Sequence, residues 1–235
     1  MKSKNVTALC KCCFKPIRPE TLPSLLSDYP ICSKCFLKMK PKLRKRKLEK
    51  WKGHCLYPYN ETLRKLIYDF KGCGDYELKS VFLCHYKTIL RVFYRDYVLV
   101  PAPSAECHNL RRGYNHVTEI FGEIGLPIVE ALKKTKEIKQ SDLHFKERQK
   151  IGEILEFEEG VSLEGKKVLF VDDILTSGST AKACMRLIEK AGAKKVRFLI
   201  LAETQNKKFK KRKIIIKAPF FFPYLRNLFP FSKRE

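Results

Sequence analysis

The clearest chemistry in this sequence lies where an apolar segment ends in two acidic residues. Residues 168–171 form a continuous apolar run, which is typical of a strand buried on both faces. Asp172 and Asp173 follow directly. A small, hydroxyl-rich turn then leads into a predicted helix, and its residues are Thr176, Ser177, Gly178, Ser179 and Thr180.

Such a turn suits a phosphate, because it presents backbone N–H groups and hydroxyls at a helix N-terminus. Gly178 lets the backbone approach closely. Two carboxylates at a strand end accept hydrogen bonds from a vicinal diol and can reach a Mg²⁺ shell. A ribose 5-phosphate satisfies both demands. The alternative is a plain turn in which the acidic pair makes local bonds and Ser177 or Ser179 caps the helix.

The segments around this motif alternate between helix and strand. We predict helices at 60–72, 76–96, 113–125 and 179–191, and strands at 97–100, 168–171 and 196–202. Residues 127–132 are expected to form a strand or the approach to one. This alternation predicts a parallel α/β sheet flanked by helices. In such a sheet, ligands bind beyond the carboxyl ends of the strands, where the acidic pair lies.

The string 168–180 looks like the phosphoribosyl pyrophosphate (PRPP) binding motif of type I phosphoribosyltransferases. Residues 98–104, followed by 111–115 (RRGYN), resemble the pyrophosphate-loop region of the ComF (competence protein F) family. Residues 66–76 are similar to that family's Lys-containing entry helix and turn. The spacing of the family's flexible catalytic loop is matched by Thr135, Gln140, Leu143 and Arg148. The resemblance covers residues 10–204 and is weak before residue 60.

This resemblance implies a type I phosphoribosyltransferase-like fold with a small N-terminal zinc ribbon, and a site that binds PRPP with Mg²⁺. It implies displacement of pyrophosphate at C1 of the ribose. Asp172 and Asp173 would steady the sugar, while a loop carrying Gln140 and Arg148 closes over the reaction. The implied PRPP-binding residues are Asp172, Asp173, Thr176, Ser177, Gly178, Ser179, Thr180, Pro103, Ser104, Arg111, Arg112 and Lys71. For Arg111 and Arg112 individually, a solvated surface role is the alternative.

The sequence departs from the family pattern at several positions. His116 stands where the arginine motif usually ends in Gln. Ala105 and His108 occupy positions that usually hold a serine and a basic residue. The flexible loop usually opens with Arg, and here only lysines are available: Lys133, Lys134 and Lys136. These departures are compatible with PRPP binding but do not favour efficient turnover.

Two Cys-x2-Cys pairs near the N-terminus form a second group with chemistry. Cys10 and Cys13 with Cys32 and Cys35 can supply four thiolates to one structural Zn²⁺. Cys12 leaves the choice open, because it can replace Cys10 or Cys13. A head of about 40 residues has too little core to fold alone, so the metal would supply stability. Free cysteines in a small helical head are the alternative.

Positive charge is concentrated in two blocks. The 235 residues contain 49 Lys+Arg against 25 Asp+Glu, a formal net charge of +24. This favours a polyanionic partner such as nucleic acid, a phosphorylated ligand or an anionic membrane surface, with a solubilising surface as the alternative. The blocks at 38–52 and 207–217 suggest four regions: a zinc-ribbon head (1–40), a basic linker (41–53), a phosphoribosyltransferase-like domain (54–204) and a basic, aromatic tail (205–235).

Three hypotheses of function follow. The first is a ComF-like protein that binds Mg²⁺·PRPP, and here the resemblance implies a role in natural competence with imported single-stranded DNA. The second is a salvage enzyme that joins a nucleobase to PRPP. The third is a non-catalytic adaptor whose zinc head docks a helicase. We expect a soluble, cytoplasmic protein with no transmembrane span; peripheral membrane contact and oligomerisation stay open. The tail is expected to pack on the domain or a partner, or to contact single-stranded DNA or lipid.

Overall fold

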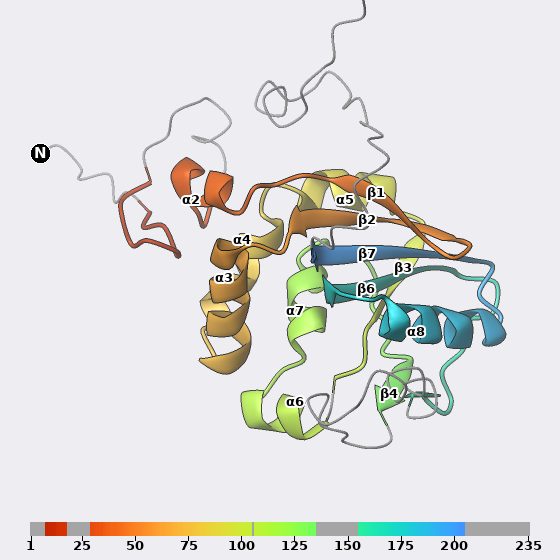
Figure 1. Cartoon of the computed structure of the whole chain (residues 1–235). Helices are drawn as coiled ribbons and strands as arrows, with labels where there is room; N and C mark the ends of the chain where they lie inside the picture. Colours follow the sequence, from red (N-terminus) through yellow and green to blue (C-terminus); the bar gives the residue numbers. More distant parts are fainter. Residues whose placement is uncertain (1–7, 18–28, 105, 135–154, 205–235) are drawn as a thin grey trace, which may run out of the picture.

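A parallel sheet forms the centre of the molecule (Figure 1). The computed structural model describes residues 8–17, 29–104, 106–134 and 155–204. Within this part of the chain, five strands pair in the order β1-β2-β7-β6-β3. Their bounds are β1 Arg44–Leu48, β2 Trp51–Pro58, β3 Tyr97–Pro101, β6 Lys167–Leu175 and β7 Lys195–Glu203. All neighbours are parallel except β1, which runs antiparallel to β2.

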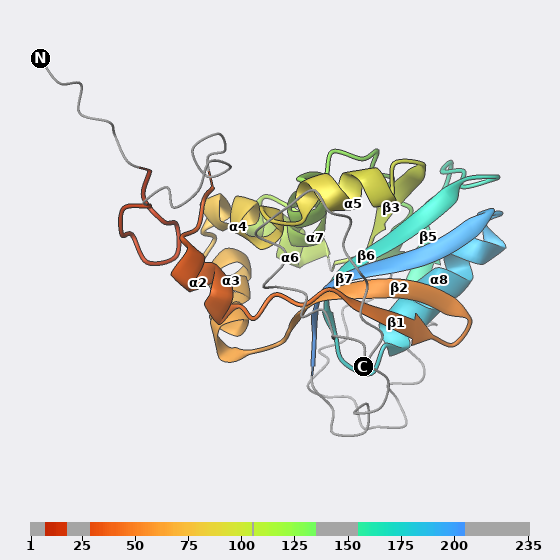
Figure 2. The same ribbon diagram turned by 90° about the horizontal axis from the view of Figure 1, so that it is seen from above.

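Helices cover both faces of this sheet (Figures 1 and 2). The helix α8 (Ser179–Lys190) packs on one face, where Cys184, Met185 and Ile188 join the apolar side chains of the strands. The opposite face is covered by α3 (Glu61–Gly72), α4 (Lys79–Leu83), α5 (Lys87–Phe93) and α7 (His116–Gly122). β6 and β7 are therefore buried on both sides, which explains their nearly continuous apolar sequences.

Local sequence signals account for the long helices. Asn60 caps α3, since its side-chain oxygen accepts a hydrogen bond from the Leu63 amide at 2.9 Å. The buried positions of α3 recur at helical spacing and are Leu63, Leu66, Ile67 and Phe70. α8 begins after Gly178, as expected from the motif. The predicted helices at 60–72 and 179–191 and the strands at 97–100, 168–171 and 196–202 are confirmed to within a few residues.

Other predicted elements differ in the structure. The segment 76–96 is not one helix but a 3₁₀ turn η1 (Tyr76–Leu78) followed by α4 and α5. The break at residues 84–86 lets Tyr86 pack edge-on against Tyr57 while His85 stacks on Phe36. The predicted helix at 113–125 is shortened to α7, which Asn115 caps through the Val117 amide. A short helix, α6 (Glu106–Arg112), precedes it.

The segment 127–132, expected to be a strand or the approach to one, leads into a strand and does not form one over its length. Ile128 makes a single parallel bridge to Leu99 beside β3. The chain then enters β4 (Leu132–Lys134), which pairs with β5 (Leu155–Phe157) in a separate two-stranded sheet. Strands β2 and β5 had no counterpart in the sequence analysis.

The basic segment predicted as a linker is instead the edge of the sheet. Residues 44–48 form β1 and pair with β2 from Arg44 opposite Cys55 to Leu48 opposite Trp51. Arg46 makes a two-point ion pair with Glu203 of β7, with N···O distances of 2.6 and 2.7 Å. Because these contacts fix the segment in place, it does not act as a free connection. The division of the chain into four regions otherwise stays a prediction.

The Cys-rich head packs directly on the main body. Cys10, Ile31 and Phe36 belong to the same core cluster as α3 and α4, and Phe36 lies in the short helix α2 (Ser33–Lys38). The imidazole ring of His85 stacks against Phe36 and against Tyr29, at centroid distances of 3.8 and 4.6 Å. The head is therefore part of the packed structure. Among the helices described, none combines the length and apolar character needed to cross a bilayer.

Candidate phosphoribosyl and metal sites

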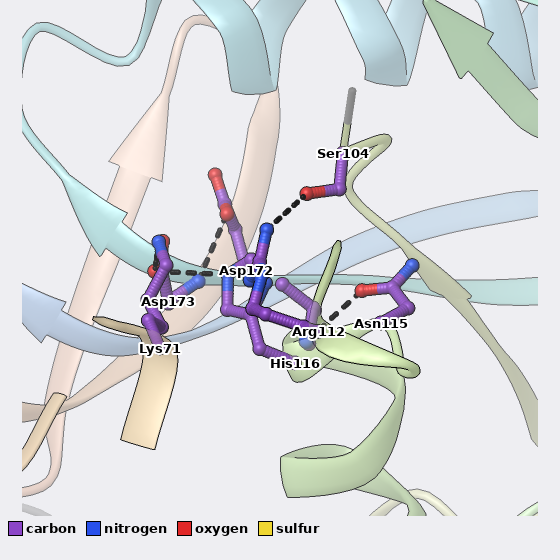
Figure 3. Close-up of polar contacts among 8 residues, drawn as sticks. Lys71, Ser104, Arg112, Asn115, His116, Asp172 and Asp173 are labelled. Atoms are coloured by element: carbon purple, nitrogen blue, oxygen red, sulfur yellow. Dashed lines mark hydrogen bonds and ion pairs between the residues drawn. The ribbon is translucent and has the colours of Figure 1, made fainter. Parts of the chain in front are cut away.

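Four chain segments bring polar side chains together beside the end of β6 (Figure 3). Asp172 and Asp173 lie within β6 itself, near its carboxyl end, rather than after it as the sequence suggested. Lys71 contacts Asp173 from the end of α3, and His116 contacts it from the start of α7. Arg112, the last residue of α6, contacts His116. These residues define the candidate site at the carboxyl edge of the sheet, where α/β proteins bind ligands.

Asp173 is the centre of the ionic contacts. Its Oδ2 accepts a hydrogen bond from Lys71 Nζ at 2.6 Å and contacts His116 Nε2 at 3.1 Å. Arg112 Nη1 lies 2.9 Å from His116 Nδ1, and its Nη2 lies 3.5 Å from the Ser104 hydroxyl. The predicted residues Lys71, Ser104, Arg112 and Asp173 are thus connected through one histidine.

The two carboxyl groups have opposite electrostatic environments. Burial, followed by the charge of Asp173, raises the pKa of Asp172 well above its ordinary value. Burial also opposes ionisation of Asp173. There, however, the hydrogen bond from His116 and the charge of Lys71 prevail and lower its pKa below the ordinary value. The negative charge of the pair therefore resides on Asp173.

The turn after β6 combines a left-handed glycine with exposed hydroxyl groups. Gly178 has φ of +75°, a conformation that favours glycine, and it directly precedes α8. A Cβ atom added there would lie 3.2 Å from Leu48 Cδ2 of β1. Ser177 Oγ contacts the Ser179 hydroxyl at 2.9 Å and the Ser179 amide at 3.3 Å. Thr176 and Ser177 are exposed, so hydroxyls and the N-terminus of α8 face solvent at this edge.

The remaining residues that were predicted for the site lie outside the contacts described above or outside the described part of the chain. Pro103 is buried in the loop after β3, next to Ser104. Arg111 is exposed, and none of the contacts given for the described residues joins it to the cluster. Gln140 and Arg148, with Thr135 and Leu143, lie outside the described residues.

His116 lies within the candidate site, although the sequence did not single it out as a site residue. It was noted only as a departure from the family's usual Gln, yet it links Arg112 to Asp173 and is 5% exposed. Tyr114, two residues earlier, donates a hydrogen bond to the Phe70 carbonyl at 2.6 Å. This contact ties the turn before α7 to the end of α3, next to Lys71. A histidine directly after the RRGYN string was the available signal.

The four cysteines of the head form a compact group. The Sγ atoms of Cys10, Cys13, Cys32 and Cys35 all lie within 4.8 Å of one another, and those of Cys13 and Cys32 are 3.9 Å apart. A tetrahedral zinc with bonds of about 2.3 Å requires sulfur atoms about 3.8 Å apart, so these residues fit the metal. Cys12 is not a member of the group, which resolves the choice left open by the sequence.

Backbone amides favour the thiolate form of Cys10. Burial disfavours ionisation of Cys10, but the N–H groups of Cys32, Cys12 and Cys13 lower its pKa to about 7. Burial and the neighbouring Cys10 raise the pKa of Cys12 to about 12. Burial also raises the pKa of Cys32 and of Cys35, so it is the clustering of the sulfur atoms, and not the pKa of the thiols, that separates the four cysteines from Cys12.

Residues 111–222 match the phosphoribosyl transferase domain family, a range that includes Arg112, His116 and the acidic pair. Competence protein ComFC of Streptococcus pneumoniae (strain ATCC BAA-255 / R6) is 31% identical over 144 residues, which cover 60% of this chain and 64% of ComFC. An adenine phosphoribosyltransferase of Mycoplasmopsis pulmonis (strain UAB CTIP) is 32% identical over 95 residues, covering 40% of this chain and 56% of that enzyme. A hypoxanthine phosphoribosyltransferase structure from Staphylococcus aureus gives a TM-score of 0.37 at 16% identity, covers 60% of this chain and 69% of that one, and is too distant to carry an inference.

The fold and the site together define a protein of the phosphoribosyltransferase type. Within that class, the chain is ComF-like, because it is similar to the competence protein ComFC over 60% of its length. The matches span 64% and 56% of the lengths of the two curated relatives.

Proposed function

We propose that this chain is a ComF-like phosphoribosyltransferase-family protein that binds PRPP together with Mg²⁺. The observation that carries the proposal is the position of Asp173, which lies at the carboxyl edge of the sheet with Lys71 at 2.6 Å. The Gly178 turn follows on the same strand. The carboxylates are suited to the ribose hydroxyls, and the turn to the 5-phosphate.

The cationic side chains suit the pyrophosphate end of the ligand. Lys71 and Arg112 lie on the α3 and α6 side of the acidic pair, so they can hold a polyphosphate that extends from C1 of the ribose. Mg²⁺ bound with PRPP would neutralise charge on the leaving pyrophosphate. The carboxyl and hydroxyl oxygens at this edge are the hard ligands that Mg²⁺ chemistry requires nearby.

Transfer to a nucleobase is the second candidate activity. It is favoured by the match to an adenine phosphoribosyltransferase. Incubation with Mg²⁺·PRPP and each common nucleobase, followed by measurement of released pyrophosphate, tests it. PRPP binding without base-dependent release supports the ComF-like proposal, whereas release with adenine supports the salvage enzyme. A non-catalytic adaptor that docks a helicase through the zinc head predicts neither binding nor release.

We extend the proposal to single-stranded DNA, in a cytoplasmic role linked to natural competence, because the name of the pneumococcal relative refers to competence. A row of cations on one sheet face supports this extension. Lys47 of β1 lies opposite Lys52 of β2, which lies opposite Arg197 of β7. Residues directly opposite in a sheet point to the same face, so three like charges stand side by side.

This cationic row lacks acidic partners in the described structure. None of the ion pairs between described residues includes Lys47, Lys52 or Arg197. The next position on the same face is His54, and burial followed by the charges of Lys45 and Arg197 lowers its pKa to about 4. Neighbouring like charges destabilise a sheet, so a polyanion that neutralises them is favoured.

Replacing Lys47, Lys52 and Arg197 together by Gln is expected to weaken binding of single-stranded DNA. Loss of three phosphate contacts should reduce the slope of log Kd against log salt concentration by about 2, and the affinity at 0.15 M salt by about tenfold or more. Fluorescence anisotropy of a labelled oligonucleotide over a salt series measures both.

A matched variant controls for net charge. The exposed lysines Lys34, Lys87 and Lys190 lie on helices, away from the strands of the cationic row. Their replacement by Gln removes an equal number of positive charges. If this control weakens DNA binding as much as the first variant does, the cationic row is not the contact. The predicted contact through the tail lies at 205–235, outside the described residues.

A further inference from the structure

His116 occupies a position at which its two ring nitrogens have different partners. Nδ1 lies 2.9 Å from Arg112 Nη1, and Nε2 lies 3.1 Å from Asp173 Oδ2. A guanidinium group can only donate hydrogen bonds, and an ionised carboxylate can only accept them. Nδ1 must therefore act as the acceptor and Nε2 as the donor, so the geometry selects the neutral Nε2–H form of the ring.

The surroundings of His116 agree with this form. The charged groups that face it are Asp173 on β6, Lys71 at the end of α3 and Arg112 at the end of α6. Burial is the largest influence and, with the two cations, keeps the pKa of His116 below its ordinary value despite Asp173. A protonated ring would place an N–H group against the Arg112 guanidinium.

We propose that His116 is the positioning residue of the PRPP site, since it orients Arg112 toward the pyrophosphate and Asp173 toward the ribose at the same time. This inference rests on the proposed function. His116 bridges the end of α6 and β6, although Asp173 lies 57 positions after it in the chain. The contact of Arg112 Nη1 with the imidazole, at 2.9 Å, is shorter than the contact of its Nη2 with the Ser104 hydroxyl, at 3.5 Å. The imidazole therefore helps to direct the guanidinium.

Two substitutions at His116 separate positioning from simple packing. Gln is a neutral side chain that offers one acceptor and one donor, as the Nε2–H imidazole does, whereas Leu fills the space and offers neither. We expect His116→Leu to weaken Mg²⁺·PRPP binding by about tenfold or more, because Arg112 loses one close acceptor and Asp173 loses a donor. His116→Gln is expected to restore most of that affinity. Isothermal titration calorimetry of the full, zinc-loaded chain measures both, and thermal melts confirm that each variant is folded.

A double-mutant cycle with Arg112→Gln tests the link itself. If His116 acts through Arg112, removal of the guanidinium costs much less affinity in the His116→Leu background than in the wild type. Independent, additive losses would show that His116 does not act through Arg112 and would overturn the inference.

A measurement without PRPP keeps the two proposals distinguishable. Nitrogen-15 NMR of the histidine side chains in the free protein is expected to show the Nε2–H tautomer for His116 at pH 7.5, assigned by its loss in His116→Gln. An Nδ1–H or doubly protonated ring overturns the inference whether or not PRPP binds. If the wild type binds no PRPP, the proposed function fails. If it binds and the Gln and Leu variants are equally weak, the positioning role fails while the proposed function stands.

Discussion

Asp173→Asn is expected to reduce the affinity for Mg²⁺·PRPP by about a hundredfold or more. Asp173 carries the negative charge of the acidic pair and accepts hydrogen bonds from Lys71 and His116. The amide removes this charge and places donors where both partners also donate. A lost charge-assisted hydrogen bond of this kind costs about 1.5–3 kcal/mol, and here two are lost together. Calorimetric titration at pH 7.5 measures the change.

Asp172→Asn is the matched control for this prediction. Burial and the neighbouring charge raise the pKa of Asp172 well above its ordinary value, so this carboxyl tends to hold its proton. An amide imitates a protonated carboxyl, so we expect a smaller loss of affinity from Asp172→Asn than from Asp173→Asn. An equal or larger loss from Asp172→Asn would contradict the assignment of the charge to Asp173.

Cys32→Ser is expected to remove zinc from the protein and to lower its melting temperature. Cys32 is one of the four clustered cysteines, and the neighbouring Ile31 and Phe36 pack in the core with α3 and α4. Loss of the metal therefore loosens part of the main core as well as the head. We expect metal content to fall from one zinc per chain to nearly none, and the melting temperature to fall on the order of 10 °C. Metal analysis and thermal denaturation measure these effects.

Cys12→Ser distinguishes zinc ligation from a general effect of losing a thiol. Cys12 lies between Cys10 and Cys13 in the sequence, yet its sulfur is not among the four that lie within 4.8 Å of one another. This variant should keep its zinc and most of its stability. Loss of zinc from Cys12→Ser with retention in Cys10→Ser or Cys13→Ser would show that the ligand set is different.

The elements that the sequence predicts well are those with strong local signals. β6 and β7 are continuous apolar runs, and α3 has both a cap at Asn60 and a regular apolar face. β1 was not predicted as a strand, because its sequence alternates exposed lysines with arginines and has no apolar residue before Leu48. What makes it a strand is its pairing with β2 and the ion pair of Arg46 with Glu203, which is 157 residues away.

In the candidate site, too, some features can be predicted from the sequence and others cannot. The acidic pair and the Gly178 turn lie close together in the sequence, so a short motif is enough to predict their chemistry. The contact between Lys71 and Asp173 joins residues 102 positions apart, and the sequence alone does not give their distance. The role of His116 depends on which partner faces each ring nitrogen, and this became visible only in three dimensions. The histidine that stands here in place of the family's usual Gln keeps one donor and one acceptor at this position.

The most direct test of the phosphoribosyl site is a calorimetric titration of the folded, zinc-loaded wild-type chain with PRPP, with and without Mg²⁺. The arrangement of Asp173, Lys71 and the Gly178 turn predicts saturable binding of one PRPP per chain that is much stronger with Mg²⁺. Ribose 5-phosphate and pyrophosphate should each compete weakly, because each fills one part of the site. Absence of binding in both conditions would contradict the proposed function.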